Sequence, residues 1–590
     1  MIDVVIDLET DGLLDELTKV HCISYLPLES GGILEPFLLE PGELDSFPEV
    51  LQELEEKHGR VRLVGHNLLG FDLPVLERFY GELDVEVFDT LVAARMLYPD
   101  SSTISDGNIP ADIKKNCSFH SLERWGHRLK ILKGAYSKQT DWQEYDEEMG
   151  EYCVQDVRVT QALYAAVEGK IPDEALMLEQ AFAEELEDMM QRGVYIDPDA
   201  SAALHSEIEY QLDLAQAECR DLFPPRKVVT VSPKKQIRKE KLIPFNPGSR
   251  IQIAENLKAL GWKPKEFTPT GRPKVDENIL ESLPYPQAKK LARVMMLQKR
   301  ASQLYDTDNA ILPQVKIDNR LYGRIRHIGT VTHRCSHSGP NLGQVPSVRK
   351  PYGKDFRGLF VPGIEGWKFV GCDASGLELR VAAHYMQPFD GGAYIDHVLH
   401  GDIHTVNMEA LGITDRDLAK TFFYALVYGA GNAKLGRILT GKDNKKVGKE
   451  YRERLLSGVK GFKELVQAVK SKAEETGRVK LIDGRTVPVR SSHSALNTLF
   501  QGSGAVLMKK ATVLLPEFAP EPPYSRMNPD GRWGMVLHVH DEFQCEAHAD
   551  IAECLGESAV ESIREAGVRL GSRCPLDGEA KIGNSWKETH

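Results

Sequence analysis

The stretch VGCDASGLELR, residues 370–380, has the pattern of a buried β-strand that runs directly into a helix, with Asp373 where the strand ends. Functional side chains of α/β proteins collect at strand ends, so this carboxylate is a candidate site residue. Far along the chain, MVLHVHDEFQCE at 535–546 predicts two alternating strands around a turn that bears Asp541 and Glu542. An acidic turn by itself is typical of an ordinary polar loop, so a third segment must decide its meaning.

That third segment is DRDLAKTFFYALVYG, residues 415–429, which has the pattern of a helix. Its basic and aromatic residues recur every fourth position and form a slowly turning stripe about 18 Å long. Phosphoryl transfer to a nucleotide requires carboxylates on one side of a triphosphate and cations on the other. We therefore expect Arg416 and Lys420 to bind the β- and γ-phosphates. Tyr424 would face the sugar and base, and Tyr428 would stack near the template base.

A second set of carboxylates lies near the N-terminus. Asp7 and Glu9 are two residues apart on a predicted strand, so both side chains project from one face. Alone, such a pair is more typical of a solvated edge. GHNLLGFD adds Asp72, and YCVQD adds Tyr152 and Asp156 one helical turn apart. Four carboxylates and a phenol fit two Mg²⁺ ions, one generating hydroxide and one stabilising the leaving 3′-oxygen, with the phenol orienting the water.

Length and composition are those of a multidomain globular enzyme. The chain has 590 residues, 42% hydrophobic and 27% charged, which predicts about two to four domains. No apolar run approaches the roughly 20 residues that span a bilayer. The N-terminus lacks the basic and apolar regions of a signal peptide, so we expect no membrane partner and a cytoplasmic location. The nine cysteines form no CxxC pair and are expected to be free thiols.

A net charge of −14 argues only weakly against a nucleic-acid partner, because acidic residues can occupy metal sites while a groove stays positive. Residues 226–241 hold seven basic residues and one acidic residue. This run fits a solvated loop, and equally a segment that contacts DNA phosphates. Prolines around it predict an extended or hairpin insertion within a helical arm. The phosphate contacts would come from Lys234, Lys235, Arg238, Lys239 and Lys241.

These motifs together resemble those of a known enzyme family. DLET, GHNLLGFD and YCVQD are similar to the three motifs of the DEDDy 3′→5′ exonucleases that accompany DNA polymerases. The segments around Asp373, residues 415–429 and Asp541 resemble motifs A, B and C of family A DNA polymerases, in the form found in T-seven-type, short-tailed bacteriophages. The resemblance implies a DNA-directed DNA polymerase, a nucleotidyltransferase that replicates phage DNA, with a 3′→5′ proofreading exonuclease.

The same resemblance implies an α/β multidomain fold. A ribonuclease H-like exonuclease domain would be followed by a right-hand polymerase domain. The implied boundaries are exonuclease 1–175, thumb 176–320, palm 321–400, fingers 401–489 and palm again 490–590.

Roles for individual residues also follow from the resemblance. The polymerase metal ligands would be Asp373, the backbone of Ala374 and Asp541, assisted by Glu542. The exonuclease metal ligands would be Asp7, Glu9, Asp72 and Asp156. Glu378 would press against the sugar together with Tyr424, and His404 would touch the β-phosphate. The implied contacts to the DNA minor groove or primer terminus are Arg334, Asn341, Asn497, Gln501 and His540.

The implied cofactor is Mg²⁺, two ions per active site, with Mn²⁺ as an alternative ion. The implied partners are primer-template DNA and dNTPs, with a phage helicase-primase and a single-strand-binding protein as accessory proteins. In T-seven-type phage polymerases a large thumb insertion captures thioredoxin. Here the interval between Leu222 and Phe245 is only 22 residues, too short for such a domain, so we expect no thioredoxin.

Two positions depart from the family pattern. His333 stands where the family usually has Gly before the arginine, and Gly343 stands where bacterial DNA polymerase I has a Gln that contacts the primer. Two other functions stay open from sequence alone. One is a nuclease whose polymerase half only binds DNA, and the other is a structural DNA clamp.

Overall fold

The computed structural model describes residues 1–14, 16–29, 35–134, 136, 142–231, 238–524, 528 and 530–590, with 227–231 and 238–241 described by backbone only. The chain divides into two compact units. The first unit contains Met1–Arg192, Ile325–Ser336 and Val370–Lys581. The second contains Gly193–Arg324, His337–Phe369 and Ile582–His590. The predicted α/β multidomain class is confirmed.

The first unit begins with a five-stranded mixed sheet in the order β3-β2-β1-β4-β5. Its strands are β1 (Ile2–Thr10), β2 (Val20–Pro27), β3 (Phe37–Leu39), β4 (Val61–Gly65) and β5 (Glu86–Asp89). The central strand β1 runs antiparallel to β2 and parallel to β4. It is nearly continuously apolar at Val4, Val5 and Ile6, which are fully buried, because helices cover both faces.

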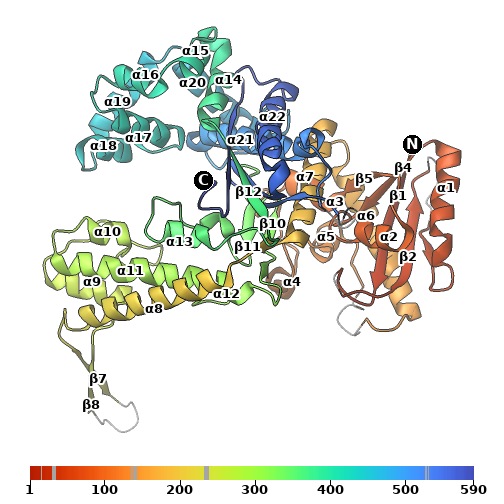
Figure 1. Ribbon diagram of the computed structural model, residues 1–590, viewed down its shortest axis with the longest axis horizontal. Helices are drawn as coiled ribbons and strands as arrows, with labels where there is room; N and C mark the ends of the chain where they lie inside the picture. The colour runs from red at the N-terminus through yellow and green to blue at the C-terminus, as the bar shows by residue number, and fades with distance from the viewer. Residues whose placement is uncertain are drawn as a thin grey trace. The chain divides into compact units, whose positions relative to one another are not determined.

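The helices around this sheet are α1 (Phe47–His58), α2 (Asp72–Tyr80), α3 (Thr90–Leu97), α4 (Ala111–Asn116), α5 (Leu122–Leu129) and α6 (Glu147–Val167). Helix α6 packs on β1 and β2 from one side, and α1 covers the other side (Figure 1). The next helix, α7 (Asp173–Arg192), packs against α3 of this region and also against elements near the C-terminus.

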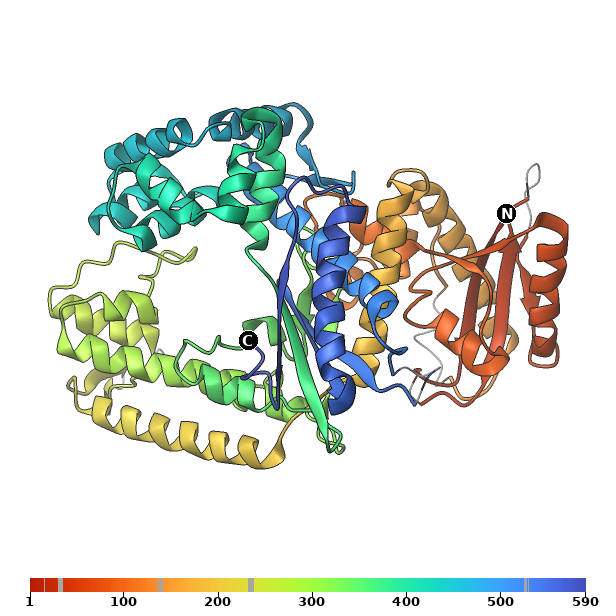
Figure 2. The ribbon, with the colours of Figure 1, turned by 45° about the horizontal axis from the view of Figure 1, so that its top comes forward.

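A second sheet in the first unit has the order β15-β16-β12-β17. Its strands are β12 (Trp367–Ala374), β15 (Trp533–Val539), β16 (Glu542–His548) and β17 (Gly578–Gly583). Figure 2 shows the green strand β12 among the blue strands of the C-terminal segment, although they are far apart in sequence. The two predicted strands around the turn at Asp541 are confirmed, since β15 and β16 pair antiparallel up to Val539 and Glu542.

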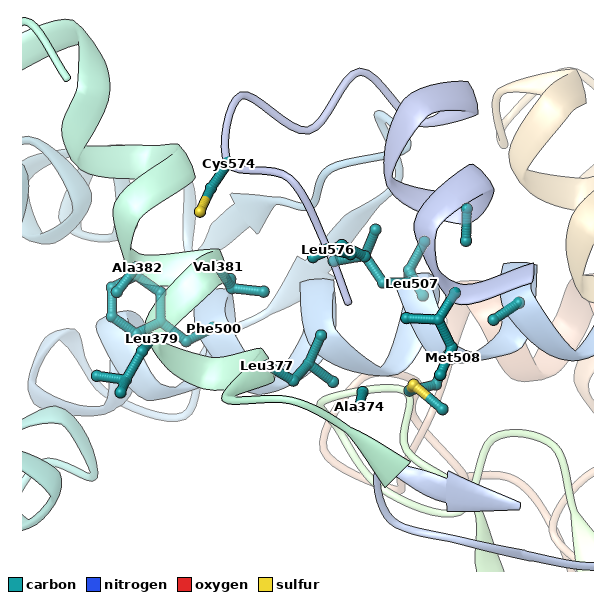
Figure 3. Packing of buried hydrophobic residues seen from close by; sticks show 14 of the residues in the cluster. Ala374, Leu377, Leu379, Val381, Ala382, Phe500, Leu507, Met508, Cys574 and Leu576 are labelled. Carbon is teal, nitrogen blue, oxygen red and sulfur yellow. The ribbon is translucent and has the colours of Figure 1, made fainter. Parts of the chain in front are cut away.

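Three long helices pack with this sheet: α14 (Leu377–Asp390), α21 (Ala495–Phe518) and α22 (Ala552–Arg569). The predicted strand-to-helix junction is confirmed, because α14 begins three residues after β12 ends. Ala374 and Leu377 at this junction are buried near Leu507 and Met508 of α21 (Figure 3). The junction therefore rests on the main hydrophobic core.

The remainder of the first unit is mostly helical. Its elements are α15 (Ala393–His400), α16 (Ile403–Leu411), α17 (Arg416–Val427), α18 (Asn432–Thr440), α19 (Lys445–Gly458), α20 (Phe462–Thr476), β13 (Arg478–Lys480) and β14 (Thr486–Pro488). Helix α17 buries Phe422 and Phe423 against its neighbours, and Phe423 stacks on Phe462 of α20. The opposite stripe of α17 is thus left for polar contacts.

The second unit is built on the antiparallel helices α8 (Pro198–Arg220) and α11 (Pro286–Leu304), which pack together. It also contains β6 (Val194–Tyr195), β7 (Arg226–Val231), β8 (Arg238–Ile243), α9 (Arg250–Ala259), α10 (Glu277–Glu281), α12 (Ile311–Gln314), β9 (Arg320–Leu321) and α13 (Gly353–Gly358). The short strands β10 (Arg324–Arg326) and β11 (Ser336–Ser338) lie where the chain passes between units.

The predicted hairpin in the helical arm is confirmed. Strands β7 and β8 pair antiparallel, with Arg226 opposite Ile243 and Val231 opposite Arg238. Lys234 and Lys235, predicted to bind phosphate, lie outside the described residues, as do the side chains of Arg238, Lys239 and Lys241. All nine cysteines are free thiols, as predicted. Among the described residues, no helix is both long and apolar enough to span a bilayer.

Candidate active sites

The predicted carboxylates Asp373 and Asp541 lie close together in the second sheet of the first unit. The backbone N–H of Ala374, at the end of β12, donates a hydrogen bond of 3.0 Å to the carbonyl oxygen of Asp541. Asp373 is exposed, whereas Glu542 at the start of β16 is buried with 4% of its surface exposed. The turn between β15 and β16 also carries exposed His540, whose φ is +59°. The two aspartates therefore lie close together where β12 ends and β16 begins, and Glu542 beside Asp541 is buried.

The cationic and aromatic stripe predicted at residues 415–429 lies on α17. Asp415 caps the helix by accepting the Leu418 N–H at 2.9 Å, and Tyr428 follows the last helical residue. The ring of Tyr424 lies 6.1 Å from the ring of Tyr428 and 6.3 Å from that of His404. Burial, together with the nearby charges of Glu378 and Asp541, raises the pKa of Tyr424 to about 12. The stripe thus faces the carboxylates of the sheet.

Arg416, the first residue of that stripe, has a carboxylate partner. Its Nε and Nη2 donate to Asp402 at 2.6 and 3.0 Å. These hydrogen bonds hold the pKa of the Asp402 carboxyl below its usual range. Asp402 also caps α16 by accepting the N–H of His404 at 3.0 Å. A phosphate bound by Arg416 would therefore replace or join an existing bidentate contact.

Glu378 has a hydrogen-bond partner that the sequence patterns did not indicate. Both of its carboxylate oxygens accept the hydroxyl of Tyr428 at 2.7 Å, and Arg334 Nη2 lies 3.6 Å from its Oε1. Burial and this hydrogen bond raise the pKa of Tyr428. From the sequence we expect Glu378 to act with Tyr424. In the structure its hydrogen-bond partner is Tyr428, one helical turn further along the stripe. Arg334, Glu378 and Tyr428 form a continuous polar contact.

The other residues predicted to contact DNA lie on separate elements. Asn497 and Gln501 are one helical turn apart near the start of α21, so they share a face. Asn341 belongs to the second unit, where it precedes a short 3₁₀ turn at Leu342–Gln344. Gly343, one of the two departures from the family pattern, lies in that turn.

The N-terminal carboxylates come together between β1, α2 and α6. We call Asp7, Glu9, Asp72 and Asp156 the N-terminal carboxylate cluster. Burial, followed by the charges of Asp156, Glu9 and Asp72, raises the pKa of Asp7 well above its usual value. Burial likewise raises the pKa of Asp72 to about 8 and that of Asp156 to about 6. Buried like charges of this kind are stabilised by a bound cation.

The donor atoms of the cluster fit a hard divalent ion. Oxygen atoms of Asp7 and Glu9 and the sulfur of Cys153 lie within 4.8 Å of one another. Oδ1 of Asp156 is buried and has no hydrogen-bond partner among the described residues. Carboxylate oxygens are the preferred ligands of Mg²⁺, and an unpartnered buried oxygen is a ready ligand atom.

Lys133 is a member of this site that no motif indicated. Its ammonium pairs with Oδ2 of Asp156 and lies 4.6 Å from the centre of the Tyr152 ring. The positive charge also lowers the pKa values of Asp7 and Glu9 against the effect of burial. Lys133 follows α5 in a segment without regular periodicity, so the sequence carries no signal for it.

Asp89 is a second residue that sequence patterns missed. Its carboxylate accepts the N–H groups of Asn67 at 3.1 Å, Leu69 at 3.2 Å and Leu91 at 2.8 Å. Asp89 therefore caps α3 and also holds the turn that leads to Asp72 at the start of α2. Its own N–H donates to Gln180 of α7 at 2.7 Å.

Comparisons with known proteins agree with one another. The family model described as "DNA polymerase family A" matches residues 230–588. The DNA-directed DNA polymerase of Enterobacteria phage T3 is 31% identical, with 99% of each chain covered. That of Escherichia phage T7 is 30% identical, with 100% of each chain covered. The solved POL domain of Pol1 from M. smegmatis, complexed with DNA primer-template and dNTP, has a TM-score of 0.72 at 19% identity, covering 100% of this chain and 96% of that one.

Proposed function

Because this chain belongs to DNA polymerase family A, we propose that it extends a primer at Asp373 and Asp541 and removes mispaired 3′ ends at the N-terminal carboxylate cluster. DNA-directed DNA polymerase activity follows from the family and from the full-length similarity to the phage T3 and T7 enzymes. The similarity to phage polymerases also supports a role in phage DNA replication. The metal chemistry, the roles of single residues and the exonuclease are the proposed refinements.

For the polymerase reaction, the carboxylates of Asp373 and Asp541, with the Ala374 backbone, would hold two Mg²⁺ ions. Bound there, Mg²⁺ supplies Lewis-acid stabilisation of the phosphoryl oxygens and makes the primer 3′-hydroxyl more acidic. Asp373 is exposed and so is accessible to a triphosphate. The hydrogen bond between Ala374 and Asp541 fixes the separation of the two strand ends, which favours a preformed site.

The stripe on α17 would bind the incoming dNTP. Lys420 and Arg416 carry the charges for the β- and γ-phosphates, and His404 lies near the same stretch of the stripe. Glu378 would close the edge of the sugar pocket. Its carboxylate already accepts the hydroxyl of Tyr428, so it would leave no room and no free acceptor for a ribose 2′-hydroxyl. This arrangement selects deoxyribose without reading the base.

Arg334, Asn341, Asn497, Gln501 and His540 would contact the primer-template. Minor-groove acceptors occur at the same places in all correct base pairs, so such contacts check pair shape and not sequence. The 3.6 Å approach of Arg334 to Glu378 supports a position for Arg334 beside the sugar pocket.

For the exonuclease reaction, the order β3-β2-β1-β4-β5 with an antiparallel β2 supports a ribonuclease H-like domain. Asp7, Glu9, Asp72 and Asp156 would hold two Mg²⁺ ions. Tyr152 would orient the attacking water, and its ring is held by the ammonium of Lys133. Lys133 would keep Asp156 and Tyr152 in place, since it contacts both.

The division of the chain and its partners remain proposals of the same kind. The proposed domains are exonuclease 1–175, thumb 176–320, palm 321–400 and 490–590, and fingers 401–489. A phage helicase-primase and a single-strand-binding protein are the proposed accessory proteins. Thioredoxin is not among them, because the interval that would hold its binding domain contains a short hairpin.

The observation that carries this proposal is the approach of Asp541, Tyr424 and Glu378 from three distant segments to one place. The test is primer extension on a short primer-template with all four dNTPs, with Mg²⁺ and with EDTA. We expect extension only with the metal. Degradation of the primer without any extension would favour a nuclease whose polymerase half only binds DNA. The absence of both reactions would favour the structural clamp.

A further inference from the structure

A buried cluster of charges in the first unit is used by neither proposed active site. Glu179 of α7 is fully buried, and its Oε1 accepts Lys509 Nζ of α21 at 2.5 Å and His327 Nδ1 at 2.9 Å. Its Oε2 accepts Nη1 of Arg485, which lies in the turn between β13 and β14. Arg485 Nε donates to Asp483 at 2.6 Å. Two acids and two bases therefore balance one another in the interior.

Such a network is a poor device for stability alone. Well-packed apolar residues often serve equally well, because the desolvation of buried charges offsets their attraction. Burial lowers the pKa of His327 to about 4, so this histidine is neutral at pH 7 and the charge balance holds. What a buried network can supply is a defined geometry, since each partner accepts or donates in one direction only.

The network holds both ends of one turn. Lys509 Nζ donates to the carbonyl of His327 at 2.8 Å. At the other end, Nδ1 of His333 lies 3.4 Å from Nη1 of Arg485, and only 1% of His333 is exposed. Between them the turn closes on itself, because the Gly329 N–H donates to the Arg334 carbonyl at 2.9 Å. We call residues 327–334 the clamped turn.

The backbone of the clamped turn needs such support. His333 has a φ of +57°, in the left-handed region that side chains other than glycine rarely adopt. The turn also lies tightly on α21, since a Cβ added to Gly502 would come within 3.3 Å of the Thr332 carbonyl. A histidine at the position where the family has glycine thus strains the backbone locally. In return its side chain contacts Arg485 in the interior.

The clamped turn ends in Arg334. The guanidinium of Arg334 lies 3.6 Å from Glu378, which in turn accepts the hydroxyl of Tyr428 at 2.7 Å. Glu179 is therefore connected to the polymerase site through Arg485, His333 and the backbone of one turn.

We propose that Glu179 is a positioning residue of the polymerase reaction: through Arg485 and Lys509 it fixes the clamped turn so that Arg334 reaches the primer terminus. This rests on the proposed contact of Arg334 with the minor groove. Without the clamp, His333 can relax to negative φ and the guanidinium of Arg334 turns away. A mispaired terminus displaces the minor-groove acceptors, so loss of a fixed Arg334 removes a check on pair shape.

The test variant is Glu179→Gln with Lys509→Met, which keeps side-chain volume and removes one buried charge of each sign. The matched control is Glu184→Gln, the same change at an exposed position of the same helix. Single-nucleotide addition is measured on matched and mispaired primers whose last linkage is a phosphorothioate, which suppresses excision. We expect the ratio of matched to mispaired rates to fall about tenfold in the variant and to stay unchanged in the control.

A double-mutant cycle with Arg334→Ala separates this inference from the role of Arg334 itself. If Glu179 acts through Arg334, its variant has no further effect once Arg334 is Ala. An equal tenfold fall in both backgrounds, or no fall in a folded variant, would overturn the proposal. If Arg334→Ala alone leaves the ratio unchanged, the proposed minor-groove contact is wrong and the inference falls with it.

A second variant guards against misfolding. His333→Gly keeps every charge of the network, relieves the positive φ and removes the contact to Arg485. We expect native thermal stability and a fall of the same ratio by about twofold to fivefold. An unchanged ratio in this variant would contradict the route through His333.

Discussion

The two proposed active sites hold their carboxylates in opposite surroundings. In the N-terminal carboxylate cluster Asp72 and Asp156 are buried and Asp7 and Glu9 are half-buried. Burial and the neighbouring charges raise the pKa values of Asp7 and Glu9, and Lys133 pairs with Asp156. Asp373 is exposed at the end of β12, and Tyr424 of α17 lies near Asp541 and Glu378, which belong to separate elements. The carboxyls of the cluster, whose pKa values are raised, must lose protons to bind metal. The difference predicts that the two activities respond separately to mutation and to pH.

The largest effect is expected at Asp373 and Asp541. Asp541→Asn keeps the shape of the side chain but removes charge from the metal site. We expect nucleotide addition to fall about a thousandfold, because several kcal/mol of charge stabilisation are lost. Single-turnover extension measures this, and 3′→5′ excision should continue. Loss of DNA binding together with both activities would instead indicate a folding role for Asp541.

The buried cluster gives the reverse pattern. Asp7→Ala with Glu9→Ala removes two of its four carboxylates, so excision from single-stranded 3′ ends should fall about a hundredfold or more. Primer extension should continue near the parental rate, since these residues lie on a different sheet. Parental excision by this variant would refute the assignment of the exonuclease.

Lys133 sharpens the comparison, because its ammonium pairs with Asp156 inside the N-terminal carboxylate cluster. Lys133→Met should slow excision about tenfold as Asp156 and Tyr152 lose their shared partner. The Mg²⁺ concentration for half-maximal excision should fall, since the cluster becomes more negative. Lys133→Arg is the control and should keep most of the activity. A variant with parental turnover and parental Mg²⁺ dependence would show that Lys133 has no role.

The smallest expected effect is on the thermal stability of the metal-free protein. Folding raises the pKa of Asp72 to about 8 from about 3.9, so the native state keeps a proton that the unfolded chain releases. The stabilisation that this proton gives to the native state is complete below about pH 4 and is lost as the pH rises toward 8. In EDTA we expect the first melting transition to fall by about 2–6 °C between pH 6 and 8, and less in Asp72→Asn. A transition that rises over this range, or is unaffected by Asp72→Asn, would contradict this.

Local sequence patterns predicted the strands and the helix that carry the site residues. They could not predict the contacts between segments that are distant in the sequence. The strand ending at Asp373, the turn at Asp541 and the helix of residues 416–427 each have a strong period of their own. Lys133 lies in a segment without a period, and the partner of Glu378 depends on how α14 and α17 approach each other. The sequence marked Arg334 but gave no reason to single out the residues beneath it.

Glu179 and His333 illustrate why. In EALMLEQAFAEELEDMMQRG, Glu179 is one of several acids, and nothing local distinguishes the one that is fully buried from the exposed ones. His333 was recognised as a departure from glycine, but its positive φ and its approach to Arg485 follow from tertiary packing.

The most direct test of two separate sites is one time course on a primer with a mispaired 3′ nucleotide, with Mg²⁺ and all dNTPs present. The unaltered chain should first shorten the primer to the last correct pair and then extend it to full length. The Asp7→Ala and Glu9→Ala variant should show no shortened species and only slow extension, and Asp541→Asn should show shortening alone. Extension of the mispaired primer by the unaltered chain without any shortened species, or loss of both activities in either variant, would contradict the account.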